Sequence, residues 1–317
     1  MKATRTIVLM LSALLLSVSG SLVAATVSVD SPNLIETFPV PDGAWALAFD
    51  GANVWVTNYG FSINKVTKLR ASDGALLGAF DTGSGPISAT FDGANIWVAN
   101  GYDDSVTKLR ASDGTLLGTF PAGDNPYGIA FDGQNVWVAN WFDGTVRKIR
   151  PSDGTTLGIF QAGSEANDLV SDGVNLWVVN KGGSAVAKLR VSDGTLLDTF
   201  LIPDTGGDIN GITFDGRNIW VGDSNRDRVI KLRATDGAIL GRPHVGDVPW
   251  GITFDGLHIW VSNIGASDVA RLRPSNGMFE HRYPTGTNPR GILFDGASIW
   301  VANEYDNSVT KITPPQR

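Results

Sequence analysis

The sequence predicts an all-β fold, a seven-bladed β-propeller of four-stranded antiparallel blades, from three observations. A ten-residue motif recurs almost unchanged, as FDGANIWVAN at residues 91–100, FDGQNVWVAN at 131–140 and FDGASIWVAN at 294–303. Its tryptophan recurs at intervals of 40 to 43 residues, at Trp55, Trp97, Trp137, Trp177, Trp220, Trp260 and Trp300. Each interval contains four short runs of β-forming residues and no helical period.

The four expected strands of one repeat are YGIAF at residues 127–131, NVWVAN at 135–140, TVRKIR at 145–150 and TTLGIF at 155–160. The second run is rich in β-branched and aromatic residues, which strands prefer. Asp-Gly separates the first run from the second, and Ser-Asp-Gly separates the third from the fourth. Because Asp-Gly supplies the positive φ of tight hairpin turns, the runs should pair as antiparallel neighbours.

The two ends of the chain predict how the ring closes. Residues 34–51, LIETFPVPDGAWALAFDG, align with LLGTFPAGDNPYGIAFDG at 116–133, so the propeller at 34–317 begins with a fourth strand. It ends with a third strand in SVTKITPPQR. We therefore expect residues 34–38 to complete the last blade, formed by residues 290–313, which protects the edges that an open array would expose. An open solenoid would need capping repeats, and none is visible.

Two further repeated features are expected to be structural. The tryptophan and its apolar neighbours should pack each blade against the next. The recurring KLR-type segment places arginines near the Asp of the tight turns, where we expect structural ion pairs and not a nucleic-acid stripe. These arginines are Arg70, Arg110, Arg150, Arg190, Arg233 and Arg273.

The N-terminus and the composition indicate an exported protein. Residues 1–25 have a basic start, a short apolar stretch and small residues before Thr26, which predicts a secretory signal peptide, with a retained membrane anchor as the alternative. Residues 26–33 form a short linker. The net charge of −7 becomes −9 once Lys2 and Arg5 are removed, so nucleic acid is a poor partner. The chain has no Cys, which excludes disulfides and thiolate sites. We expect a secreted or periplasmic monomer.

The repeat WVANxxDxSVTKLRxSDGTLLGTFPAGxxPxGIAFDG resembles the YVTN-type propeller repeat, with WVAN where that family has YVTN. The resemblance covers residues 34–317 and implies the propeller fold. Relatives of this type are commonly exported bacterial proteins. Because propellers host many activities, the resemblance says little about function.

The blades also resemble those of virginiamycin B lyase, whose repeat carries WFTE and whose activity uses a His base and a Glu-bound magnesium ion. At the position of that Glu this chain has Asn58, Asn100, Asn140, Asn180, Asp223, Asn263 and Asn303. His244 is expected at the end of a fourth strand, His258 in a tight hairpin and His281 on an outer strand. A base must reach the proton that it removes, so these positions do not support lyase chemistry.

A second related family, the gluconolactonase and regucalcin group, holds a divalent metal over the channel with Glu, Asn and Asp. Asn167 and Asn210 are aligned in adjacent blades here, and Asp223 and Glu304 are expected near the same rim. Two amide oxygens and a carboxylate could hold calcium. No metal motif with fixed spacing is present, so we predict ordinary polar loops with no metal and no cofactor.

The differences between the repeats point to one face of the ring. The two changes in repeat length fall in residues 58–68 and 202–212, which should lie opposite the tight turns. Just before each first strand the residues are Trp45, Ile87, Tyr127, Asn167, Asn210, Trp250 and Arg290. Just after each second strand they are Tyr59, Gly101, Trp141, Lys181, Ser224, Ile264 and Glu304. Loops on a rigid scaffold commonly carry binding sites, although drift at unconstrained positions gives the same pattern.

We therefore expect an exported propeller that binds a sugar, a peptide or another protein without catalysis. The predicted ligand-binding residues are Trp45, Tyr59, Tyr127, Trp141, Asn167, Asn210, Trp250, Arg290 and Glu304. The tryptophans among them should face solvent. Two alternatives stay open: a propeller enzyme, either a virginiamycin B lyase-like lyase or a metal-dependent lactonase-like hydrolase, and a purely structural module.

Overall fold

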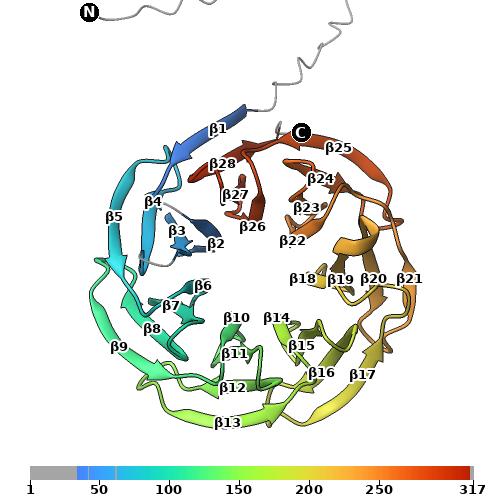
Figure 1. The fold of residues 1–317 in the computed structure, drawn as a ribbon, viewed down its shortest axis with the longest axis horizontal. Helices are drawn as coiled ribbons and strands as arrows, with labels where there is room; N and C mark the ends of the chain where they lie inside the picture. The colour runs from blue at the N-terminus through green and yellow to red at the C-terminus, as the bar shows by residue number, and fades with distance from the viewer. Residues whose placement is uncertain (1–33, 42, 61–62, 315–317) are drawn as a thin grey trace, which may run out of the picture.

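A computed structural model describes residues 34–41, 43–60 and 63–314 as a closed ring of seven sheets. Each sheet has four antiparallel strands, and the seven sheets are arranged in a ring about a common axis (Figure 1). The predicted seven-bladed propeller is therefore confirmed. The proposed signal peptide at 1–25 and the linker at 26–33 lie outside the described residues.

We number blades 1 to 7 along the chain, by their innermost strands. The innermost strands are β2 (Ala44–Phe49), β6 (Pro86–Phe91), β10 (Pro126–Phe131), β14 (Ala166–Ser171), β18 (Ile209–Phe214), β22 (Pro249–Phe254) and β26 (Pro289–Phe294). The second strands are β3 (Asn53–Asn58), β7 (Asn95–Asn100), β11 (Val136–Asn140), β15 (Asn175–Asn180), β19 (Asn218–Asp223), β23 (Ile259–Asn263) and β27 (Ile299–Asn303).

The outer half of each blade follows the same order. The third strands are β4 (Lys65–Arg70), β8 (Ser105–Arg110), β12 (Thr145–Ile149), β16 (Ala185–Arg190), β20 (Arg228–Arg233), β24 (Asp268–Leu272) and β28 (Ser308–Thr313). The outermost strands are β5 (Leu76–Asp81), β9 (Leu116–Pro121), β13 (Thr156–Gln161), β17 (Leu196–Leu201), β21 (Ile239–Gly241), β25 (Phe279–Pro284) and β1 (Leu34–Pro39). A 3₁₀ helix, η1, covers Ser224–Arg226. Among the described residues, no helix has the length and apolar character to cross a membrane.

The repeated motif joins a tight turn to a buried ring in every blade. In blade 3, Asp132 Oδ1 accepts hydrogen bonds from the backbone N–H groups of Gln134 and Asn135, while Oδ2 accepts one from Trp137 Nε1. The indole bond recurs in all seven blades at 2.6–2.8 Å. All seven tryptophans of this row are fully buried. The motif is therefore repeated because one carboxylate both closes the turn and satisfies the buried indole.

Ring closure occurs as predicted. Strand β1 pairs antiparallel with β28, from Leu34 opposite Thr313 to Pro39 opposite Ser308. The two strands from opposite ends of the chain lie side by side in Figure 1. Phe38 stacks on the buried Trp300, with ring centroids 5.7 Å apart. The N-terminal strand thus supplies both the hydrogen bonds and an aromatic contact of the last blade.

Buried lysines connect most blades to the next one. The amino group of each lies 4.7–5.2 Å from the centre of the row tryptophan in its own blade. It donates at 2.6–2.8 Å to a backbone carbonyl of the following blade. These lysines are Lys68, Lys108, Lys148, Lys231 and Lys311, which are buried, and Lys188, which is partly buried. Blade 6 has Arg271 at this position, 5.6 Å from the centre of the Trp260 ring and paired with Glu280 of its own blade.

The repeated arginines form ion pairs beside the tight turns, as predicted for five of the six. Arg70, Arg110, Arg150, Arg190 and Arg233 each contact the turn Asp three residues later, at 2.8–3.0 Å. Arg273 also forms an ion pair, but with a different partner: Asn276 takes the place of the turn Asp, and Arg273 contacts Glu280 at 2.9 Å. About half of each side chain is exposed, so these pairs stabilise the fold only slightly.

Candidate binding site

The inner strands bring seven variable side chains to one end of the channel. Each is the second residue of its strand, and together they form the mouth ring: Trp45, Ile87, Tyr127, Asn167, Asn210, Trp250 and Arg290. The expectation that they precede the first strands is wrong. Pairing already begins one residue earlier, as in Pro126 opposite Asn140, and an irregularity in register follows before Ile129. These side chains are therefore held by the sheet and not by a free loop.

The variable residues after the second strands lie beside the mouth ring. The backbone N–H of Trp141 donates to the carbonyl of Asn125 at 2.9 Å. This places the Trp141 ring next to the Tyr127 ring, with centroids 5.2 Å apart. In blade 1, Tyr59 packs on Trp45 at 4.5 Å in the same way. The predicted aromatic residues are thus brought together in pairs within blades.

Arg290 joins the aromatic residues of blades 1 and 6. Its guanidinium lies 4.1 Å from the centre of the Trp45 ring and 4.5 Å from that of Trp250. The two indoles are in edge contact, with centroids 6.4 Å apart. Arg290 Nε also donates to Glu304 at 2.7 Å, and Glu304 accepts from the amide of Asn288. A cation between two aromatic faces attracts both rings, so this group is preorganised.

The polar side of the mouth is equally well paired. Asn167 donates to Asn210 at 2.9 Å, and the two side chains are 2% and 1% exposed. Lys181 forms an ion pair with Asp208 at 2.7 Å. Its amino group also lies 5.5 Å from the Trp141 ring and 5.7 Å from the Trp250 ring. The rim therefore connects blades 3, 4 and 6 through one lysine.

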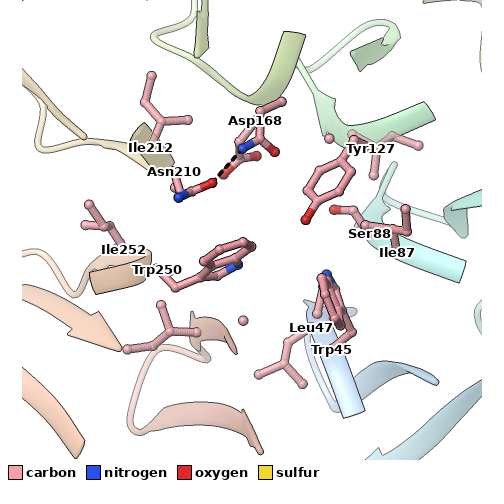
Figure 2. A pocket seen from close by; sticks show the side chains of 18 of the residues that line it. Trp45, Leu47, Ile87, Ser88, Tyr127, Asp168, Asn210, Ile212, Trp250 and Ile252 are labelled. Atoms are coloured by element: carbon pink, nitrogen blue, oxygen red, sulfur yellow. Dashed lines mark hydrogen bonds between the residues drawn. The ribbon is translucent and has the colours of Figure 1, made fainter. Parts of the chain in front are cut away.

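Six of the seven mouth-ring residues, all except Arg290, line a cavity of about 220 Å³ at the channel mouth. Figure 2 shows Trp45, Tyr127, Asn210 and Trp250 facing one another around the opening. Below them is a narrow ring of small residues, and below that an apolar layer. The apolar layer comprises Leu47, Ala89, Ile129, Ile212, Ile252 and Ile292. The cavity therefore has aromatic and amide groups at its opening and an apolar base.

One functional candidate was missed in the sequence. At the position after the mouth ring, six blades have Ala46, Ser88, Gly128, Gly211, Gly251 and Gly291, and blade 4 has Asp168. Asp168 lines the cavity (Figure 2), and its Oδ1 accepts a hydrogen bond from Leu169 N–H at 2.8 Å. Burial raises the pKa of this carboxyl to about 6, although backbone hydrogen bonds from Leu169 and Ile212 lower it. Comparing the blades one residue further along the chain would have found it.

Four of the other six blades have glycine at this position, and the close approach of the next blade explains it. A Cβ on Gly291 would lie 2.7 Å from the Cα of Ala46 in the next blade, and one on Gly251 would lie 2.6 Å from the carbonyl oxygen of Arg290. Both distances are shorter than real Cβ contacts, so a side chain here requires the neighbouring strand to move. Asp168 is therefore an unusual residue in a tightly packed ring.

The mouth tryptophans are less exposed than expected. Trp45, Trp141 and Trp250 are only partly accessible to solvent, because they stack on neighbouring rings and on the cations of Arg290 and Lys181. By contrast Phe142, the residue after Trp141, is 68% exposed. The prediction that the mouth tryptophans simply face solvent is wrong.

The residues considered for a metal site already have partners in the protein. Asn167 and Asn210 bind each other, and Glu304 binds Arg290. Asp223 is completely buried at the end of β19 and pairs with Arg228 at 2.7 Å, so it does not reach the cavity. In the described part of the chain, no group of three or more His, Asp or Glu residues is placed to hold a metal ion.

The three histidines lie away from the channel mouth. The backbone of His244 forms an isolated antiparallel β-bridge with Arg228 on β20. His281 lies on the outermost strand β25, with its ring against that of Tyr283. His258 is in the hairpin between β22 and β23, 3.4 Å from Glu280. His258 and His281 lie where the sequence predicted them, whereas His244 lies beyond the end of β21, which stops at Gly241.

Comparison with known proteins supports the fold. No protein-family model matches the sequence, and no curated protein matches it. A streptogramin B lyase structure has a TM-score of 0.76 at 22% identity, covering 89% of this chain and 98% of that one. A Kuenenia stuttgartiensis hydrazine synthase chain also has a TM-score of 0.76, at 19% identity, covering 93% of this chain and 99% of that one. At these identities the chain shares the β-propeller fold with both structures, and the likeness goes no further than the fold.

Proposed function

We propose that the protein is an exported, monomeric propeller of the YVTN type that binds a small ligand group at its channel mouth without catalysis. The ligand group would be a sugar ring or a peptide side chain. The export part of the proposal rests on the signal-like segment at residues 1–25.

The observation that carries the proposal is the convergence of aromatic side chains on one cavity. Trp45, Tyr127 and Trp250 line it, and Tyr59 and Trp141 stack behind them. Aromatic rings offer large rigid surfaces for binding, and ligand sites combine such surfaces with a few placed polar groups. The volume of about 220 Å³ is below the roughly 300–1,000 Å³ of drug-sized sites, so it suits one ring or one side chain.

The test is a binding screen with glucose, galactose, N-acetylglucosamine and blocked amino acids, followed by calorimetry on variants. We expect Trp45→Ala and Trp250→Ala each to weaken binding by about 1–3 kcal/mol. Phe142→Ala is the matched control, because this exposed aromatic residue is on the same face and does not line the cavity. Equal binding by all three variants would overturn the proposal.

The enzyme alternative has one observation in its favour, the shared fold with a streptogramin B lyase. The resemblance of the blades to virginiamycin B lyase implies a His base. The cavity wall is instead formed by aromatic, amide and aliphatic groups together with Asp168. Incubation with streptogramin B, followed by mass spectrometry, separates the two functions. Unchanged streptogramin B is the result that the binding proposal expects, and turnover that persists in purified protein would favour the enzyme.

A further inference from the structure

Asp168 has no charged neighbour in the wall of the cavity. Among the described residues that line it, every other side chain is aromatic, aliphatic, amide, hydroxyl or glycine. The carboxylate is partly buried, and the hydrogen bond that it accepts from Leu169 is a backbone one. A carboxylate in such surroundings gains from a cation that enters the cavity.

Both cations that contact the mouth tryptophans are paired with carboxylates. Arg290 contacts Glu304 at 2.7 Å, and Lys181 contacts Asp208 at 2.7 Å. Each pair contributes no net charge, and among the described residues that line the cavity the charge is that of Asp168 in its ionised form. The whole chain is acidic as well, with a net charge of −7. Both the local and the overall field therefore favour a cationic ligand.

The aromatic wall suits the same kind of ligand. Trp45, Tyr127 and Trp250 face the cavity that Asp168 also lines (Figure 2). Indole and phenol faces attract cations, and the mouth already holds Arg290 and Lys181 against these rings. A flexible chain ending in an ammonium group could place its stem against the rings and its charge at Asp168.

We propose that the cavity selects ligands with a primary ammonium group, which pairs with the carboxylate of Asp168 while the alkyl stem packs on Trp45, Tyr127 and Trp250. This inference rests on the proposed function and names the ligand class for that site. The ammonium could belong to a free amine or to a lysine side chain of a peptide.

The experiment compares matched probes on the full-length mature protein by calorimetry. Butylammonium and N-acetyl-lysine amide carry the ammonium group, and 1-butanol and Nε-acetylated N-acetyl-lysine amide are their neutral counterparts. We expect each cation to bind at least about tenfold more tightly than its neutral counterpart. The tighter of the two cations identifies the source of the ammonium group. Cations that bind no better than their neutral counterparts would overturn the inference.

Two variants in blade 4 assign the effect to Asp168. Asp168→Asn should lose the preference for the cations. Asp198→Asn should keep it, because Asp198 is exposed on β17 and makes the same 2.8 Å bond to the next backbone N–H. Retained preference in a folded Asp168→Asn protein would contradict the inference.

A pH titration of the unmodified protein covers the case in which Asp168→Asn does not fold. The groups facing Asp168 are Tyr127, whose pKa burial raises, and the neutral Asn167 and Asn210. At the rim are the pairs Lys181–Asp208 and Arg290–Glu304. Binding of butylammonium should therefore strengthen as pH rises through about 6, where Asp168 ionises, and then level off. Affinity that does not change between pH 5 and 7.5 would overturn the inference.

The two proposals fail in different ways. If sugars bind and depend on Trp45 and Trp250 while ammonium probes do not bind, the ligand class is wrong and the binding site remains. If no probe responds to substitution of the mouth tryptophans, the proposed function itself is wrong.

Discussion

The guanidinium of Arg290 lies 4.1 Å from the centre of the Trp45 ring, so the last blade and the first meet at the channel mouth through a cation–π contact. The two residues are 245 positions apart in the chain, and they are neighbours only because the ring closes. Trp250 covers the other side of the guanidinium at 4.5 Å. The aromatic wall of the cavity is therefore held in place before any ligand arrives.

Substituting a tryptophan of the buried row should reduce the stability of the fold more than substituting a tryptophan of the channel mouth. Trp137→Ala removes a fully buried indole and its bond to Asp132, so we expect a loss of ~3–5 kcal/mol. Trp250→Ala removes a partly exposed ring with an edge contact and two cation contacts, for which ~1–2 kcal/mol is expected. Urea denaturation measures both. Equal losses would mean that the mouth tryptophans belong to the core.

The buried lysines should contribute more than the repeated arginines. Lys148→Met leaves the carbonyl of Val191 in the next blade without its donor, with an expected cost of about 1–3 kcal/mol. Arg150→Met removes an exposed ion pair with Asp153, three residues later, and should cost less than about 1 kcal/mol. Thermal unfolding of the two variants compares them directly. A larger loss for Arg150→Met would refute the assignment of blade-to-blade contacts to the lysines.

Closure by β1 can be tested by deletion. Removing residues 34–38 exposes the edge of β28 and uncovers Trp300, which Phe38 normally covers. We expect loss of cooperative unfolding or aggregation, because an open strand edge pairs with other chains. Light scattering and calorimetry detect either outcome. A stable, monomeric deletion protein would contradict closure by this strand.

Stability should also depend on pH through Asp168. Its pKa rises from 3.8 to about 6 in the folded protein, so the folded state binds the proton more tightly than the unfolded state does. The stabilising effect of protonation is complete below pH 3.8 and is lost as pH rises through 6. Asp168→Asn removes this titration, so its stability relative to the unmodified protein should increase between pH 4.5 and 7.5. A difference that stays constant over this range would show that the carboxyl does not titrate there.

The fold could be predicted from the sequence because the residues that determine each blade recur in all seven repeats. The Asp-Gly turns, the tryptophan row and the unmatched end strands each imply one arrangement, and they agree. The contacts of the buried lysines were not predicted, because each joins two different blades. The amino group of Lys311, for example, donates to the carbonyl of Ala71 in the first blade.

Comparison of the repeats also predicted part of the candidate site. Variation between blades located the mouth residues, but it could not show that Arg290 lies between Trp45 and Trp250, because that contact depends on side-chain direction. It also could not show that Asn167 is hydrogen-bonded to Asn210 and that Glu304 is paired with Arg290. Asp168 was visible as the one charged residue in its row, and a comparison extended by one position reaches it.

The most direct test of binding at the channel mouth uses the indole N–H signals of the ten tryptophans in a two-dimensional NMR spectrum. Seven belong to the buried row, each bonded to an Asp, and three, Trp45, Trp141 and Trp250, belong to the mouth. During titration with butylammonium, and separately with the sugars of the screen, a ligand that binds should shift the three mouth signals and leave the seven others in place. Binding that shifts none of the three mouth signals would contradict the account.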